Sequence, residues 1–155
     1  MPLVARESIS IAASPQIVWP WMADFDHMAV WNEKLESHNA PSLDRLGVGA
    51  SFWVTYRWRE TTHQMRANVE MLNAPFRFTV RYDGGDLGRD GWVRETVKLS
   101  PFHGTTVLKR EVRMHDPRIP RWARVVIGLI ARFGKPKGES DLQAVRRLVL
   151  EEIES

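Results

Sequence analysis

Two runs of alternating apolar and polar residues, 93–99 and 106–112, limit what this chain can fold into more than any other feature. Between them lies Ser100-Pro101-Phe102-His103-Gly104, which contains the proline and glycine that are typical of turns. Alternation with a period of two on both sides of a turn predicts an antiparallel hairpin with one apolar and one polar face. The chain is therefore expected to contain an antiparallel sheet.

The expected register of this hairpin places two charged residues on its apolar face. We expect the pairs Leu99–Thr106, Val97–Leu108, Glu95–Arg110 and Val93–Val112, with Thr96–Lys109 and Arg94–Glu111 on the polar face. A carboxylate that faces a guanidinium inside an apolar cavity could orient the polar group of a ligand, or let Glu95 act as a general base. The alternative is an ordinary ion pair at the wet end of the sheet.

Three further segments alternate in the same way and extend the sheet. Their apolar positions are Phe52, Val54, Tyr56 and Trp58, then Met65, Ala67, Val69 and Met71, then Phe76, Phe78, Val80 and Tyr82. The segment Asn73-Ala74-Pro75 is predicted to turn the chain, so that Met71 pairs with Phe76 and Glu70 lies opposite Arg77. Residues 5–11 and 34–39 are predicted to form shorter strands, and 83–91 a glycine-rich loop. One face of the sheet is expected to be wet.

Two short helices and one closing helix are expected around this sheet. Ser14-Pro15 is a typical helix start, and this helix is predicted to run to Ala23 with a bend at Pro20. A second short helix follows, with Asp26 as its cap. Residues 140–143 match a capping box before an amphipathic helix, whose apolar stripe is Leu142, Val145, Leu148, Val149 and Ile153.

Composition excludes several classes of function. The chain has no cysteine, which excludes disulfides, thiolate catalysis and thiolate metal sites. The five histidines are scattered without ligand spacing, so we expect no metal site and no cofactor. The net charge of +3 is mild and no recognition motif accompanies the outward arginines, so no nucleic-acid partner is expected. The first residues contain no apolar core of signal-peptide length, and a cytoplasmic location is therefore expected.

The order of elements covers nearly the whole chain and is that of a known superfamily. The matching residues are Ile9-Ser10-Ile11-Ala12-Ala13-Ser14-Pro15 before Val18-Trp19, then Asp24-Phe25 and Trp31, Leu99-Ser100-Pro101 before Gly104-Thr105-Thr106-Val107, and the helix after Ser140. In these residues the chain resembles the StAR-related lipid-transfer and birch-pollen-allergen-like superfamily, in its bacterial polyketide cyclase/dehydrase-like branch.

The resemblance implies a single ligand-binding domain over residues 1–155 with an α+β helix-grip fold. In this fold a curved antiparallel sheet of about seven strands wraps around a long C-terminal helix, and two short helices follow the first strand. The resemblance also implies an apolar cavity between the sheet and the C-terminal helix. No catalytic motif of the family is matched, so no catalytic residues are carried over.

Our first functional hypothesis is a protein that binds a small or medium hydrophobic ligand, such as a lipid, an isoprenoid or an aromatic polyketide. The predicted lining is Phe52, Val54, Tyr56, Trp58, Met65, Val69, Phe78, Val80, Tyr82, Glu95, Val97, Leu108 and Arg110. The alternative is a cyclase or dehydratase of polyketide-like substrates, with Glu95 as its acid/base group. The sequence does not decide whether the protein is an enzyme.

The apolar segment Ile119–Phe133 leaves the question of partners open. It is too short and too charged to span a membrane, but it could contact a membrane surface, where its arginines would meet acidic headgroups. The alternative is a helix that packs under the C-terminal helix or lies in a homodimer interface.

Overall fold

The computed structural model describes residues 3–115, 128, 130 and 138–155. The elements in chain order are β1 (Leu3–Ile11), α1 (Pro15–Ala23), α2 (Phe25–Trp31), β2 (Leu35–His38), β3 (Ser51–Trp58), β4 (Thr61–Asn73), β5 (Arg77–Asp83), the 3-10 helix η1 (Gly85–Leu87), β6 (Trp92–Phe102), β7 (Thr105–His115) and α4 (Asp141–Glu154). The strands form one antiparallel sheet in the order β1-β7-β6-β5-β4-β3-β2. The predicted helix-grip fold, with about seven strands and a closing helix, is confirmed.

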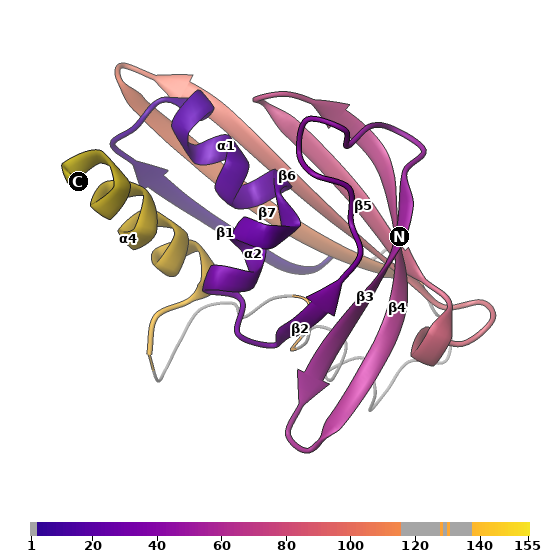
Figure 1. Ribbon diagram of the computed structural model, residues 1–155. Coiled ribbons are helices and arrows are strands. Elements are labelled where there is room, and N and C mark those ends of the chain that lie inside the picture. Colours follow the sequence, from indigo (N-terminus) through magenta and orange to yellow (C-terminus); the bar gives the residue numbers. More distant parts are fainter. Residues whose placement is uncertain (1–2, 116–127, 129, 131–137) are drawn as a thin grey trace.

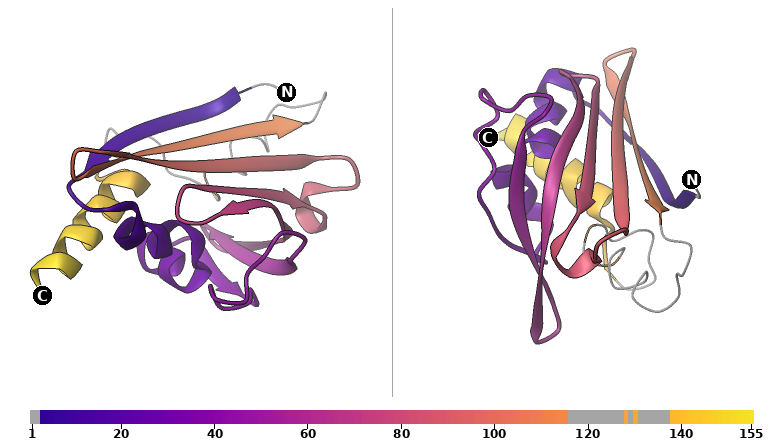
Figure 2. Two further views of the ribbon diagram at one scale, coloured as in Figure 1. Left: turned by 90° about the horizontal axis from the view of Figure 1, so that it is seen from above. Right: turned by 90° about the vertical axis from the view of Figure 1, so that its right-hand side faces the viewer.

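The helices α1, α2 and α4 lie against one face of the curved sheet (Figures 1 and 2). The helix α4 packs against β1, α1 against β6, and α2 against β2. The strand residues that alternate toward these helices are buried, including Val54, Met65, Val80 and Leu108. Their neighbours on the opposite face are largely exposed, so the sheet has the wet face that its alternation predicts.

The β6–β7 hairpin has a register two residues away from the predicted one. Leu99 pairs with Leu108, and Val97 pairs with Arg110, so that Glu95 lies opposite Val112. The pairs expected on the polar face, Thr96–Lys109 and Arg94–Glu111, are wrong for the same reason, because Thr96 faces Glu111 and Arg94 faces Arg113. The strands extend to Phe102 and Thr105, and only His103 and Gly104, both with positive φ, form the turn. A slip of two keeps every side chain on its predicted face.

The β4–β5 connection also departs from the prediction. A bulge between Val69 and Met71 shifts the register, so that Met71 pairs with Thr79 and is 38% exposed. Phe76 precedes β5 and is exposed rather than inward. Glu70 does not pair with Arg77: its carboxylate accepts from Arg94 Nε at 2.6 Å.

The helix termini follow the sequence closely but not at every cap. The helix α1 starts after Ser14 as predicted, although the Ser14 hydroxyl makes no capping hydrogen bond. The cap of α2 is Asp24, which accepts from the backbone N–H of Asp26, so the assignment of Asp26 as cap was wrong.

The capping box of α4 is confirmed, with Ser140 accepting from the Gln143 N–H and the Gln143 side chain accepting from the Ser140 N–H. The stripe residues Leu142, Val145 and Val149 are fully buried, whereas Ile153 is 48% exposed. The predicted stripe is therefore correct over its first two turns.

Most of the segment Ile119–Phe133 lies outside the described residues. Gly128 and Ile130 are described, and both are helical. Within the described part of the chain, no helix is long and apolar enough to span a membrane.

The facing of β7 is tested by two neighbouring substitutions. Leu108→Asp should cost more than about 4 kcal/mol, because it buries an unpaired charge at a position with no exposed surface. Lys109→Asp should change stability by less than about 1 kcal/mol, because Lys109 is exposed and pairs with Lys98. Denaturant unfolding of both variants measures the difference, and equal losses would contradict the assigned faces.

Candidate functional site

The predicted lining residues lie together on the inner face of β3 to β7. Twelve of the thirteen are buried, and Trp58 is half-buried at the end of β3. The ammonium group of Lys34 lies 4.4 Å from the centre of the Trp58 ring. This position places Trp58 at the rim of the inner face rather than within it.

The two charged residues of the inner face contact each other as predicted, although they are not directly opposite. Glu95 on β6 pairs with Val112, two positions along β7 from Arg110, and a long side chain bridges that diagonal. Arg110 Nε donates to Glu95 Oε2 at 2.6 Å, and Nη2 of the same guanidinium lies 2.5 Å from that oxygen. Both side chains are at most 5% exposed. The alternative of a surface ion pair is therefore wrong.

Three further groups that were not predicted from the sequence also contact Arg110. Nη1 donates to Asp141 Oδ2 at 3.0 Å, and Nη2 donates to the backbone oxygen of Ile130 at 2.7 Å. The guanidinium also lies over the Trp31 ring, 5.2 Å from its centre. Asp141 is the first residue of α4 and only 3% exposed. We call Glu95, Arg110 and Asp141 the buried triad.

The electrostatics of the triad keep Arg110 charged. Burial by itself lowers the pKa of this guanidinium, but the charges of Glu95 and Asp141 outweigh that effect and raise the pKa above its usual value. Asp141 also lies in the first turn of α4, where a negative charge interacts favourably with the helix dipole. The Arg110 guanidinium thus has both carboxylate groups of the triad as direct partners within an apolar interior.

Two tyrosine hydroxyls lie near the triad. Tyr56 on β3 and Tyr82 on β5 are 2% and 1% exposed, and the two phenols are close enough to affect each other's pKa. Burial raises the pKa of both phenols, and the negative charge of Glu95 raises them further. Both hydroxyls therefore keep their protons well above neutral pH and can donate hydrogen bonds.

Polar side chains of the α2–β2 connection hold the backbone at residues 128 and 130. Lys34 Nζ donates to the Gly128 oxygen at 2.6 Å, and Asn32 Nδ2 donates to the Ile130 oxygen at 3.3 Å. A small hollow of about 10 Å³ beside them is lined by Trp31, Asn32, Glu33, Lys34 and Asp141. This volume is close to the minimum for one water molecule.

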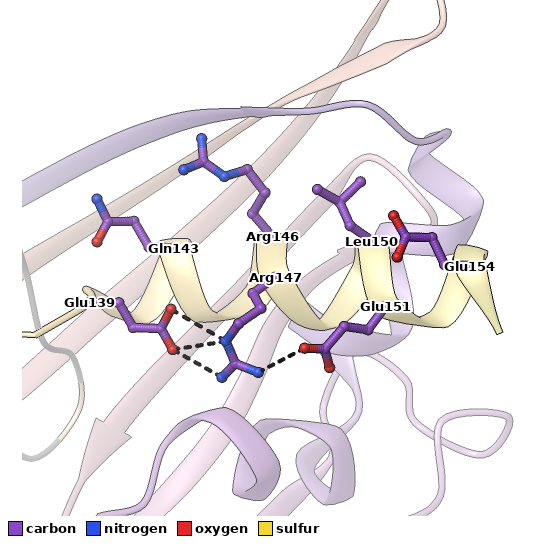
Figure 3. A pocket seen from close by; sticks show the side chains of 7 residues that line it. All are labelled: Glu139, Gln143, Arg146, Arg147, Leu150, Glu151 and Glu154. Carbon is purple, nitrogen blue, oxygen red and sulfur yellow. Dashed lines mark hydrogen bonds and ion pairs between the residues drawn. The ribbon is translucent and has the colours of Figure 1, made fainter.

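A wider, open hollow lies on the surface of α4 (Figure 3). It is lined by Glu139, Gln143, Arg146, Arg147, Leu150, Glu151 and Glu154. Arg147 spans it by pairing with Glu139 at 2.9 Å and with Glu151 at 3.4 Å. All of these side chains come from α4 and the residue just before its cap, so the hollow is a shallow gap between neighbouring side chains of one helix. It contains none of the predicted lining residues.

Metal ligands do not gather at any point that the structure describes. Among those residues, no three histidine, aspartate or glutamate side chains are close enough to share an ion. The carboxylates of the buried triad are instead bound to Arg110.

A curved antiparallel sheet packed on a C-terminal helix defines the helix-grip class of proteins, and comparisons agree. The chain is similar over its length to Ara h 8.0201 (14% identity, TM-score 0.65, covering 95% of this chain and 97% of the other). It is also similar to a norcoclaurine synthase point mutant of Thalictrum flavum (16% identity, TM-score 0.62, covering 99% of this chain and 99% of the other). A protein of Thermus thermophilus is similar as well (18% identity, TM-score 0.67, covering 97% of this chain and 99% of the other). At these identities the likeness concerns the fold. Comparison with curated proteins gives no match.

Residues 2–149 of the chain match the model of the protein family described as polyketide cyclase / dehydrase and lipid transport. The chain belongs to that family, as its resemblance to the StAR-related and birch-pollen-allergen-like superfamily predicts.

The tyrosine environment makes a spectroscopic prediction, because Tyr56 and Tyr82 are the two tyrosines of the chain. A group whose folded pKa is raised loses its stabilising contribution as the pH rises above its unfolded pKa, here about 10. Ultraviolet absorbance of tyrosinate should therefore stay low at that pH and rise only together with unfolding. Half-ionised tyrosine in protein that is still folded at this pH would contradict the buried placement.

Proposed function

We propose that the protein binds a small or medium hydrophobic ligand, such as a lipid, an isoprenoid or an aromatic polyketide, between the sheet and α4. The observation that carries this proposal is the composition of the inner face. Apolar side chains from five strands surround a few polar groups, all on the side that faces the helices. That combination is typical of pockets for mainly apolar ligands. The family description, which includes lipid transport, supports the same class.

The contacts of the inner polar groups favour particular partners for the ligand. Nε and both Nη atoms of Arg110 already bind protein acceptors. The buried hydroxyls of Tyr56 and Tyr82 keep their protons, and each can donate a hydrogen bond. We therefore expect the polar group of the ligand to accept a hydrogen bond from a tyrosine, while Arg110 and Glu95 hold the surrounding structure in place.

The enzymatic alternative requires Glu95 to act as a general base toward a polyketide-like substrate. Its Oε2 accepts from Arg110 Nε at 2.6 Å and lies 2.5 Å from Nη2, so this oxygen would have to leave the guanidinium to take up a proton. The observed contacts thus favour binding over catalysis. Glu95→Gln separates the two hypotheses, because it would abolish turnover by an enzyme.

Binding is tested by titration with the fluorescent apolar probe anilinonaphthalene sulfonate, followed by competition with a fatty acid, an isoprenoid alcohol and an aromatic polyphenol. The folded parent should bind the probe with a single saturable site, and one competitor class should displace it. Native mass spectrometry of the purified protein supplies an independent measurement of any ligand that co-purifies.

Two adjacent residues of β3 provide matched variants for this test. Val54 has no exposed surface and faces inward, whereas Thr55 is half-buried on the outer face. Val54→Phe should fill space meant for the ligand and lower probe affinity by about tenfold or more, while Thr55→Phe should bind as the parent does. Equal binding by both variants, with both folded by circular dichroism, would refute an interior site.

A further inference from the structure

One row of side chains on the outer face of the sheet consists of like charges. Arg77 on β5 pairs with Lys98 on β6, and Lys98 pairs with Lys109 on β7. All three are exposed. The row spans two strand spacings, roughly 10 Å. We call Arg77, Lys98 and Lys109 the basic row.

The basic row differs from the rest of the outer face in having no acidic partners among the described residues. Each arginine of a second cross-strand row contacts an acid: Arg81 with Asp83 at 2.9 Å, Arg94 with Glu70 at 2.6 Å and Arg113 with Glu111 at 3.6 Å. Asp83 and Glu111 are shared with Arg66 and Arg6. Arg57 on β3 likewise pairs with Glu36 at 2.5 Å. The outer face therefore neutralises most of its arginines and leaves this one row uncompensated.

Like charges directly opposite each other on neighbouring strands destabilise a sheet. A row of three such charges is therefore unfavourable for folding and is explained by an anionic partner that neutralises it. The charge of the row fixes the sign of that partner. Its position near one end of the sheet indicates which surface the partner meets.

Exposed apolar side chains lie at the same end of the sheet. Phe102, in the last pair of the β6–β7 hairpin, is 64% exposed, and Phe76, in the turn between β4 and β5, is 41% exposed. These two turns lie at one end of the antiparallel sheet (Figure 1), and the Leu99 N–H donates to the Phe76 oxygen at 2.8 Å. Met71, beside the β4–β5 turn, is a third exposed apolar residue.

Exposed apolar side chains at the turns, next to a row of uncompensated cations, suit an anionic bilayer surface, which has a charged headgroup layer above apolar acyl chains. Aromatic side chains enter the boundary between headgroups and acyl chains, and cations stay at the level of anionic headgroups. A nucleic acid would need rings on the sheet face for base stacking. The ring of Trp92 is instead stacked on His115 and covered by the guanidinium of Arg94. The exposed Trp53 lies on β3, separated by β4 from Arg77, the nearest strand position of the basic row.

We propose that the end of the sheet formed by the β4–β5 and β6–β7 turns docks on anionic lipid bilayers through the basic row and Phe102. This surface is distinct from the segment Ile119–Phe133, for which the sequence analysis considered membrane contact. It also does not depend on the proposed ligand, because vesicle binding and probe binding are measured separately.

The test is co-sedimentation of the full chain with phosphatidylcholine vesicles that contain or lack phosphatidylglycerol. The parent should bind the anionic vesicles, less tightly at higher salt, and should bind neutral vesicles weakly. Lys98→Glu changes the charge of the row by two units and should lower the partition coefficient about thirtyfold. Because it places a carboxylate between two cations, it should melt no lower than the parent.

Arg89→Glu is the matched control, since Arg89 is exposed in the loop before β6, at the other end of that strand from Phe102. It changes the net charge equally and should alter binding by less than about twofold. Phe102→Ser should lower binding about tenfold without changing its salt dependence.

Three results would overturn the proposal. The first is a parent that does not bind anionic vesicles, and the second is equal losses for Lys98→Glu and Arg89→Glu. The third is a parent that binds a single-stranded DNA oligonucleotide but not vesicles, together with loss of the DNA binding in Lys98→Glu. That result would assign the basic row to nucleic acid.

Discussion

Arg110 carries a full positive charge, and only 1% of the residue is exposed. A buried ion needs charged or hydrogen-bonding partners in the groups around it. The compensation comes from elements that are far apart in sequence: Glu95 on β6, Asp141 at the start of α4 and the backbone oxygen of Ile130. Each of these groups loses its partner if its element moves away. The need to neutralise one buried guanidinium therefore fixes the start of α4 against β7.

A second polar contact fixes the same helix end. The Ser140 hydroxyl, which caps α4, donates to Glu7 Oε1 on β1, and Glu7 lies opposite Arg110 in the β1–β7 ladder. The other oxygen, Glu7 Oε2, is buried and has no hydrogen-bond partner among the residues that the structure describes. The start of α4 is thus held by side chains of two strands, Arg110 on β7 and Glu7 on β1, whereas its far end carries the exposed Ile153. We infer that the first turns of α4 are its most stable part.

The alternation in the sequence was sufficient to predict which face most strand residues occupy, because a period of two does not depend on register. It failed at Met71, which follows a bulge, and at Phe76, which precedes β5; both are exposed. Turn geometry decides the register itself, and neither the two-residue turn at His103-Gly104 nor the bulge after Val69 has a unique signature in the sequence. The contact between Glu95 and Arg110 was predicted from an incorrect pairing and exists because arginine is long enough to bridge the diagonal. Asp141 was missed because a capping box also explains an acidic residue at that position. Its distance from Arg110 depends on how α4 packs.

Equilibrium denaturation of a series of triad variants tests most directly whether this cluster holds the fold together. Arg110→Met leaves two buried carboxylates uncompensated and should cost at least about 3–5 kcal/mol. Adding Glu95→Leu should recover only part of that loss, because Asp141 still lacks its cation, and the triple variant with Asp141→Asn should recover most of it. A loss of less than about 1 kcal/mol for Arg110→Met, or full recovery without changing Asp141, would contradict the buried triad.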